Sequence, residues 1–318
     1  MIGGTWKKSA WLIVLVAAVL GLSACGSTGA PQTKKESSTA AEATDHSTAK
    51  SEAETKDTDT RVVKDEFGKV SIPANPKRVM GVYLQDYMTA LGVRPVMQWY
   101  HPSWGKQDYL GLDVPAFDIT GSIWLIRLLA ASPDLIIVDG GVDAAKYAQY
   151  SRIAPTYRLQ EGILQNPLEI LKKVADLLNM KEKGDSVLAQ CNQKITETKD
   201  KLQKAVGNET VTVIRLNVGD KTLALFGIEN RYIGSIYKEM GLTPHPLARD
   251  MKEFNAILSE EKLPDLNAHH IIVFPSNGTW SSEENKEAEK LLDSTLWKGL
   301  PAVQNHCVHE VDFLTWMN

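Results

Sequence analysis

Short apolar runs bounded by turn residues alternate with stretches of helical periodicity from residue 61 onward. The apolar runs predict strands at Arg78–Val82, Val96–Trp99, Leu135–Val138, Val211–Leu216, Leu223–Phe226, Ile271–Phe274 and Val308–Val311. The stretches between them predict helices, among them Tyr87–Leu91, Ile123–Ala131, Ile233–Met240 and Glu283–Leu292. This alternation predicts an α/β fold of mainly parallel sheets with helices on both faces.

Two stretches of the chain resemble each other. Ser132–Val138 and Asn267–Phe274 each close a helix and enter a strand, and a turn-rich loop follows both of them. The likeness predicts two Rossmann-like lobes, an N-terminal lobe over residues 61–165 and a C-terminal lobe over residues 204–318. In such open α/β sheets ligands bind beyond the carboxyl ends of the strands, so we expect a ligand cleft between the lobes.

A helical segment is predicted between the lobes, over residues 166–203. Apolar residues recur at three- and four-residue spacing from Leu168 to Leu178, and Asn166-Pro167 is a typical helix start. Gly184 marks a break or kink partway along. A long, rigid helix joining two lobes predicts a hinge that moves little.

The N-terminus predicts an export signal. Lys7 and Lys8 precede the apolar run Ala10–Leu20, which is too short to span a membrane but has the length of a signal peptide's apolar core. Leu22–Cys25 resembles the bacterial lipobox, which implies a signal peptide over residues 1–24 and a lipid on Cys25. The alternative is an ordinary secretory signal followed by a chance cysteine.

The following stretch, residues 25–60, predicts a disordered tether. Beyond Cys25 it contains no large apolar residue and is rich in Ser, Thr, Ala, Lys and Glu, so it cannot bury apolar surface to offset its chain entropy. We therefore expect a lipid-anchored protein on the extracytoplasmic face of a cell membrane. A long tether is typical of a Gram-positive cell surface.

Composition excludes several classes of protein. Apolar residues make up 43% and charged residues 23%, so the chain is neither collagen-like nor wholly disordered. The formal net charge of −4 gives no basic footprint for nucleic acid. Three cysteines cannot form a disulfide scaffold, although a Cys191–Cys307 disulfide stays open.

The body resembles the class III substrate-binding proteins of ABC importers. The resemblance rests on the order and spacing of Leu91–Val96, Asp118–Gly121, Ser132–Ile137, Ile153–Thr156, Gly241-Leu242, Ser259–Leu263 and Trp297–Val303. It implies a monomer that captures a ferric siderophore, haem or cobalamin and delivers it to a permease. It also implies a binding role without a chemical step, and no cofactor beyond the iron that the siderophore carries.

Two departures from this family matter. The family places a permease-docking Glu in each lobe; Glu261 matches the second, but Ile126 stands at the position of the first. Docking of the first lobe is therefore in doubt or uses another acid such as Asp118. The family also ends with a helix that packs across the lobes, whereas this chain stops at Asn318, either truncated or without that helix.

The loops at the carboxyl ends of the predicted strands are rich in aromatic residues. Trp99 and Tyr100 belong to a loop that also holds His101 and Trp104, and its Pro and Ser argue against a core segment. The alternative is a loop that packs onto its own lobe. The other aromatic candidates for ligand binding are Tyr83, Trp280 and Trp316, the last of which could instead pack against the absent helix.

Two arginines are the polar candidates for ligand binding. Arg215 lies near the end of a strand, where a charge needs a partner, and the resemblance implies that it faces the cleft. A guanidinium donates paired hydrogen bonds to hydroxamate or carboxylate oxygens. Arg231 is the second candidate, with a solvated charge or a pair with Glu229 as the alternative.

Metal-site and enzyme hypotheses are weaker. His269-His270 and His306…His309 lie in predicted strands or beside them, so the members of each pair point to opposite faces and form no zinc site. The chain has no nucleophile elbow, phosphate-binding loop or dinucleotide fingerprint.

The sequence therefore predicts a non-enzymatic receptor for a ferric siderophore of the hydroxamate type. Two basic candidates among many aromatics favour hydroxamate over catecholate or citrate. Haem, with His101 or Tyr100 as axial ligand, and cobalamin stay as alternatives on the same scaffold. A surface sensor or adhesin is the alternative from a different class.

Overall fold

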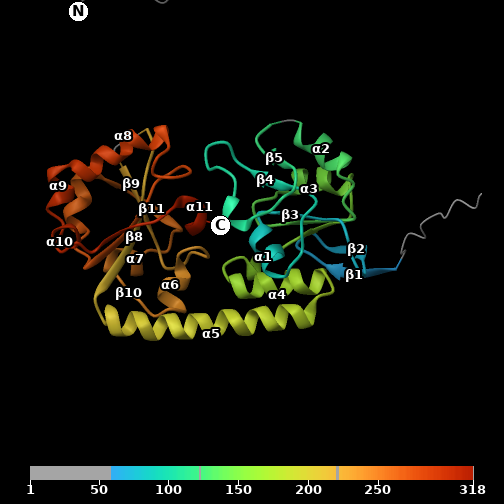
Figure 1. The fold of residues 1–318 in the computed structure, drawn as a ribbon, viewed down its shortest axis with the longest axis horizontal. Coiled ribbons are helices and arrows are strands. Elements are labelled where there is room, and N and C mark those ends of the chain that lie inside the picture. The colour runs from blue at the N-terminus through green and yellow to red at the C-terminus, as the bar shows by residue number, and fades with distance from the viewer. Residues whose placement is uncertain (1–58, 122, 220–221, 318) are drawn as a thin grey trace, which may run out of the picture. The chain divides into compact units, whose positions relative to one another are not determined.

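The structure is a computed structural model that describes residues 59–121, 123–219 and 222–317. These residues form two α/β lobes, as Figure 1 shows. The predicted signal peptide, the lipidated Cys25 and nearly all of the tether lie outside the described residues. Within the described part of the chain, no helix is both long and apolar enough to cross a membrane.

A short parallel sheet forms the centre of the first lobe. Its strand order is β3-β6-β7, with β3 at Val79–Val82, β6 at Leu135–Val138 and β7 at Thr156–Arg158. Every residue of these strands is buried, as expected for a parallel sheet that is covered on both faces. A parallel pair, β4 (Gln98–Tyr100) and β5 (Ala116–Asp118), lies outside this sheet.

An antiparallel hairpin and several helices complete the first lobe. The hairpin consists of β1 (Thr60–Lys64) and β2 (Lys69–Pro73). The helical elements are α1 (Gln85–Ala90), η1 (Asp108–Leu110), α2 (Trp124–Ala130), α3 (Ala144–Ser151), η2 (Glu161–Ile163) and α4 (Pro167–Leu177). They enclose two apolar cores, one that includes residues of α1 and α4 and another that includes residues of α2 and α3.

The second lobe contains a six-stranded mixed sheet. Its order is β11-β9-β8-β12-β13, and β10 pairs with β8 off this path. The strands are β8 (Thr210–Leu216), β9 (Thr222–Phe226), β10 (Thr243–Pro244), β11 (Asn255–Ser259), β12 (His270–Phe274) and β13 (Val308–Glu310). β10, β8, β12 and β13 run parallel, whereas β9 and β11 are antiparallel to their neighbours. The predicted class, α/β with mainly parallel sheets, is confirmed, with an antiparallel edge that the sequence pattern did not indicate.

Short helical turns cover this second sheet. They are α6 (Gly234–Lys238), α7 (Pro246–Arg249), η3 (Glu260–Asp265), η4 (Glu283–Asn285), α8 (Lys286–Glu289), η5 (Lys290–Asp293), α9 (Thr295–Lys298), α10 (Pro301–Gln304) and α11 (Phe313–Trp316). None reaches the length at which a helix is stable alone, so their packing on the sheet holds them. The predicted helix Glu283–Leu292 is in fact three successive turns, η4, α8 and η5.

The long helix α5 (Lys181–Ala205) packs on both lobes. Val187 near its start belongs to a core of the first lobe, and Leu202 near its end packs against a core of the second. Figure 1 shows α5 running along both lobes. Asn166 caps the preceding helix α4 by accepting the backbone N–H groups of Leu168 and Glu169, which confirms the predicted start.

The predicted break at Gly184 is wrong. The helical segment breaks between α4 and α5, where Asn179 has a positive φ of 55°, and Gly184 lies within an unbroken α5. A Cβ atom added to Gly184 would lie 2.5 Å from the Cβ of Ala175. Glycine is therefore required here because α4 and α5 approach closely, and not because the backbone bends.

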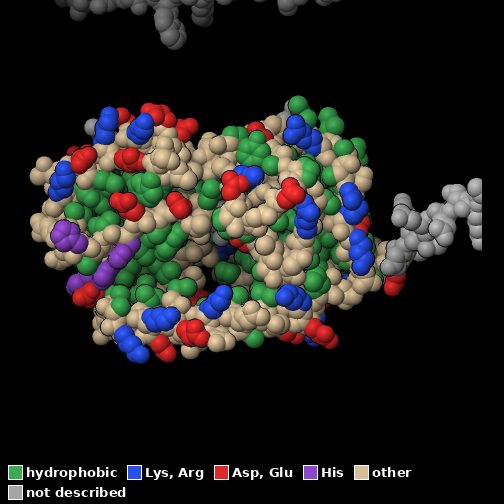
Figure 2. Space-filling view, in the orientation of Figure 1, with side chains coloured by type: hydrophobic (Ala, Val, Ile, Leu, Met, Phe, Trp, Pro, Cys, Tyr) green, Lys and Arg blue, Asp and Glu red, His purple; other side chains and the backbone are tan. Residues whose placement is uncertain are grey.

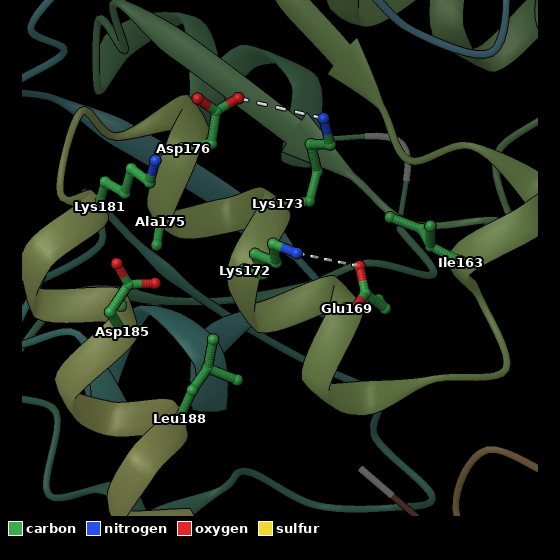
Figure 3. Close-up of a pocket in the computed structure, with 10 residues that line it drawn as sticks. Ile163, Glu169, Lys172, Lys173, Ala175, Asp176, Lys181, Asp185 and Leu188 are labelled. Carbon is green, nitrogen blue, oxygen red and sulfur yellow. Dashed lines mark ion pairs between the residues drawn. The ribbon is translucent and has the colours of Figure 1, made fainter.

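Beside this contact lies a charged hollow of about 300 Å³ (Figure 3). Lys172 points toward Glu169 and Lys173 toward Asp176, each with N···O distances of 4.0 Å. The lysines and the acidic residues that line the hollow therefore largely neutralise one another. The hollow lies along α4 and α5 rather than at the carboxyl ends of strands, so we assign it to helix packing and not to a ligand.

The two cysteines that the sequence left as a possible pair are both free thiols. Cys191 packs against a core of the first lobe, whereas Cys307 packs against a core of the second. The Cys191–Cys307 disulfide is therefore contradicted, because the thiols belong to different lobes.

Candidate functional site

A cavity of about 310 Å³ is lined by residues of both lobes. Tyr83 and Asp139 come directly after β3 and β6, at the carboxyl ends of two parallel strands of the first lobe. Arg215, Tyr232 and Phe313 line the cavity from the second lobe. This is the position at which open α/β sheets bind ligands, and we refer to the cavity as the cleft.

Tyr83 is held in an uncommon backbone conformation at the cleft. Its φ is 59°, in the left-handed region that non-glycine residues rarely adopt, and such strain gathers at functional sites. Burial, Asp139 and Tyr232 raise the pKa of its phenol to about 12. Tyr83 therefore keeps its proton at neutral pH and can donate a hydrogen bond to a ligand oxygen.

Trp99 is a core residue of the first lobe and does not line the cleft. Its side chain is 3% exposed and packs with Met80 and Phe117 in a core of the first lobe. The centroids of the Trp99 and Tyr83 rings lie 4.2 Å apart, so Trp99 packs against the Tyr83 ring without lining the cleft itself. The strand β4 extends to Tyr100, one residue beyond its predicted end, so Trp99 lies within the strand.

Tyr100 and Trp104 belong to the same aromatic segment but line two different hollows. Tyr100 lines a separate hollow with Asp118 and Arg127 and does not line the cleft. Trp104 lines the cleft, and its ring lies 5.9 Å from that of Phe313 in the second lobe. His101 stacks on Trp104 at 4.3 Å and accepts the Ser103 N–H through Nδ1, which does not favour it as a haem ligand.

Arg215 lines the cleft, as the family resemblance implied. Its Nε and Nη2 donate to Oδ1 of Asn217 at 3.3 and 3.1 Å, and its guanidinium lies 5.9 Å from the Phe226 ring. Burial lowers its pKa, but an arginine stays protonated in any protein environment. The cleft therefore holds a positively charged, partly desolvated group that is oriented before a ligand arrives.

Arg231 pairs with Asp139 across the lobes rather than with Glu229. Its Nη2 donates to Oδ2 of Asp139 at 2.7 Å and to the Tyr232 hydroxyl at 2.6 Å. The alternative partner is wrong because Glu229 instead binds Lys238, at 2.6 Å. Burial alone would lower the pKa of Arg231, but Tyr232 and Asp139 together raise it.

The residues that line the cleft include four that the sequence did not single out, Asp139, Lys146, Tyr232 and Phe313. A signal was present for Asp139, which is the first residue after the apolar strand Leu135–Val138. Gly140 and Gly141, which follow it, indicate a turn and give no sign of a ligand contact. Its partner Arg231 lies 92 residues away, so no local pattern could pair them.

Two other predicted aromatic residues lie elsewhere on the second lobe. Trp280 packs against a core of the second lobe and donates its indole N–H to the Val311 carbonyl at 3.1 Å. Trp316 lines an apolar hollow of about 500 Å³ on the second lobe, between the end of α5 and the sheet. Neither side chain lines the cleft in this structure.

The histidines meet in a way that the strand pattern did not predict. The strand pattern compares neighbours within one strand only, whereas His309 and His270 come from two adjacent parallel strands. His309 pairs in register with Ile272, and His270 lies two residues before Ile272, so His309 and His270 lie on one face of the sheet. Nδ1 of His270 lies 3.3 Å from Nε2 of His309, and Nε2 of His270 lies 2.7 Å from Glu209. Figure 2 shows histidines (purple) gathered on the second lobe.

These histidines do not complete a metal centre. In the residues that the structure describes, no group of three or more His, Cys, Asp or Glu side chains could hold a metal ion. His270 and His309 supply two nitrogen donors, and Glu209 contacts the far side of the His270 ring.

Two of the residues considered for docking, Glu261 and Ile126, are exposed, one on each lobe. Glu261 lies on η3 of the second lobe. On α2 of the first lobe Ile126 is 67% exposed, beside the exposed Ile123 and Leu129. Asp118 is held by the Thr120 hydroxyl and N–H, which lower the pKa of its carboxyl.

Comparison with known proteins places this architecture in a family. A family model described as periplasmic binding protein matches residues 87–313. The probable siderophore-binding lipoprotein YfiY of Bacillus subtilis (strain 168) is 29% identical, over 98% of this chain and 92% of the relative. The iron(3+)-hydroxamate-binding protein FhuD of the same organism is 30% identical, over 82% of each chain.

Solved structures agree. A Bacillus subtilis periplasmic binding protein of the FhuD fold family, described as a component of a ferrichrome ABC transporter, matches with a TM-score of 0.65 at 28% identity, over 80% of this chain and 92% of that one. Staphylococcus aureus SirA complexed with staphyloferrin B shares the fold, with a TM-score of 0.66 at 23% identity, over 81% and 91% of the two chains. This chain therefore belongs to the periplasmic binding protein family, a family of substrate-binding transport proteins and not of enzymes.

Proposed function

We propose that this chain is the substrate-binding lipoprotein of an ABC importer and that its ligand is a ferric siderophore of the hydroxamate type. The observation that carries the proposal is the cleft, in which Arg215 and the Tyr83 phenol lie among aromatic side chains of both lobes. Relatives named for siderophore and for iron(3+)-hydroxamate binding support it.

The chemistry of the cleft suits an iron complex whose coordination sphere is already filled. A guanidinium and a protonated phenol donate hydrogen bonds to ligand oxygens, and the rings of Trp104 and Phe313 contact the organic scaffold. Iron is then the cargo, carried within the siderophore, and the protein supplies hydrogen bonds and apolar surface rather than metal ligands. No catalytic step is part of this proposal.

Location and partners follow from the same proposal. Cys25 carries the lipid that holds the protein at the extracytoplasmic face of a cell membrane, in a Gram-positive organism, and residues 25–60 act as the tether. The loaded protein, a monomer, docks on a permease through Glu261 of the second lobe. The first lobe presents the exposed apolar Ile126 where an acid was expected, so its docking contact differs in chemistry.

Isothermal titration calorimetry with a panel of ligands tests the proposal. The panel holds a ferric trihydroxamate, a ferric tris-catecholate, ferric citrate, haem and cobalamin. We expect the trihydroxamate to bind with submicromolar Kd and its iron-free form to bind far more weakly. Ferric citrate belongs in the panel because a 28% identical relative is named an Fe(3+)-citrate-binding protein. Preferential binding of haem or cobalamin, or binding of none of these ligands, would contradict the proposal.

A further inference from the structure

A buried ion pair joins the two lobes at the cleft. The Asp139 side chain is 6% exposed and that of Arg231 is 14% exposed, with 2.7 Å between Oδ2 and Nη2. Both ends of the pair are held in place. Oδ1 of Asp139 accepts the Gly141 N–H at 3.0 Å, and Arg231 also donates to the Tyr232 hydroxyl.

The pair sets the charge that a ligand meets. Asp139 and Tyr232 line the cleft together with Arg215 and Lys146. Because Arg231 is committed to Asp139, its positive charge is neutralised, and the cationic character of the cleft rests on Arg215 and Lys146. The pair is buried, so mobile ions screen its field only weakly.

Ferric siderophores differ strongly in charge. A trihydroxamate loses one proton per chelating group and balances Fe³⁺, which gives a neutral core, whereas a tris-catecholate complex is multiply anionic. By neutralising Arg231, the Asp139 carboxylate removes one positive charge that would attract the second class, and it leaves the binding of the first class nearly unaffected. Without Asp139, Arg231 would add an uncompensated positive charge that favours anionic complexes.

We propose that Asp139 is a specificity-determining residue of this cleft, which neutralises Arg231 and thereby selects neutral ferric complexes over multiply anionic ones. The inference rests on the proposed function, because it takes a ferric siderophore as the ligand. The alternative is a purely mechanical role, in which the Asp139–Arg231 pair only holds the two lobes together. Loss of a mechanical contact changes the affinity for both classes of complex by the same factor, whereas loss of a charge filter changes their ratio.

The test compares the Kd values of a neutral ferric trihydroxamate and a ferric tris-catecholate in variants of the whole protein. In Asp139→Asn we expect the ratio of the two Kd values to shift toward the tris-catecholate by at least about tenfold. In Arg231→Gln, where Asp139 is left without its cation, the ratio shifts the opposite way. In the double variant Asp139→Asn/Arg231→Gln, which restores the net charge of the cleft, the ratio returns close to that of the wild type.

Asp113→Asn is the matched control, because Asp113 is an exposed carboxylate of the same lobe and the substitution removes the same charge. It leaves the ratio unchanged. A ratio that stays constant in both single variants, or that shifts equally in Asp113→Asn, overturns the inference while the proposed function stands. Arg231→Gln alone decides the matter if Asp139→Asn fails to fold. If the wild-type protein binds neither complex, the proposed function fails and the inference fails with it.

Discussion

At the scale of single residues, the cleft is built from side chains that a second residue holds in place. Tyr83 packs against Trp99, Asn217 orients Arg215, and Arg231 holds Asp139. Each pair places one group toward the cleft and keeps the other behind or beside it. Residues that contact a ligand and residues that support them should therefore respond differently to substitution.

Arg215 is expected to contribute directly to ligand affinity. Arg215→Gln should weaken the binding of a ferric trihydroxamate about 10- to 100-fold, because hydrogen bonds to a charged group are worth roughly 1.5–3 kcal/mol. Arg215→Lys should not restore it, since an ammonium lacks the paired donors of a guanidinium. Calorimetric titration measures the effect, and Arg249→Gln, an exposed arginine of the same lobe, is the control. Unchanged affinity in Arg215→Gln would contradict this assignment.

Trp99 is expected to contribute to stability. Trp99→Ala should lower the free energy of unfolding by about 3–5 kcal/mol, because it empties a buried site in the core of the first lobe. Urea unfolding monitored by circular dichroism measures this loss, and Trp99→Phe should retain much of the stability. A Trp99→Ala variant that unfolds like the wild type but no longer binds ligand would restore the role predicted from sequence.

At the scale of elements, the sequence predicts strands of apolar residues well and short strands that contain polar residues poorly. Leu135–Val138 is found at the predicted bounds because all four residues are apolar and buried. β7 (Thr156–Arg158) and β11 (Asn255–Ser259) were missed because they contain polar residues. Burial of Arg158 depends on partners distant in sequence, among them Glu66 and the Val142 carbonyl, which no local pattern contains.

The contact between α4 and α5 gives a prediction at this scale. Gly184→Ala should cost about 1–3 kcal/mol, since the new methyl group would overlap Ala175 at the helix crossing. For a body of this size, that loss lowers Tm by about 2–10 °C. Differential scanning calorimetry measures it, with Gly162→Ala as the control, because nothing lies within 4 Å of a Cβ at that position. Equal Tm values for the two variants would mean that the helices are packed less closely.

The parallel pair of β12 and β13 gives a prediction about pH. Burial and the neighbouring His270 hold the pKa of His309 below its usual value. The unfolded chain therefore binds more protons at this residue, so acidification below about pH 6.5 favours unfolding. His309→Gln should consequently lose less stability than the wild type between pH 7.5 and 5.5. Thermal melts at the two pH values measure this difference, and an identical loss in both proteins would contradict it.

At the scale of the whole body, function depends on contacts that join the lobes across the cleft. Trp104 and Phe313 meet there, as do Asp139 and Arg231, while α5 packs on both lobes at a distance from the cleft. The sequence predicted the two lobes, the joining helix, and Arg215 and Tyr83 at the cleft. It could not pair Asp139 with Arg231, because that pairing exists only once the lobes are assembled.

The most direct test of the central claim is a tryptophan-fluorescence titration of the protein with a ferric trihydroxamate. Trp104 lines the cleft, so a bound iron complex should quench the emission saturably at submicromolar concentration, and the iron-free siderophore should not. The amplitude should fall in Trp104→Phe, and the affinity should fall in Arg215→Gln. Absence of saturable quenching, or quenching of equal amplitude in Trp104→Phe with unchanged affinity in Arg215→Gln, would contradict the account.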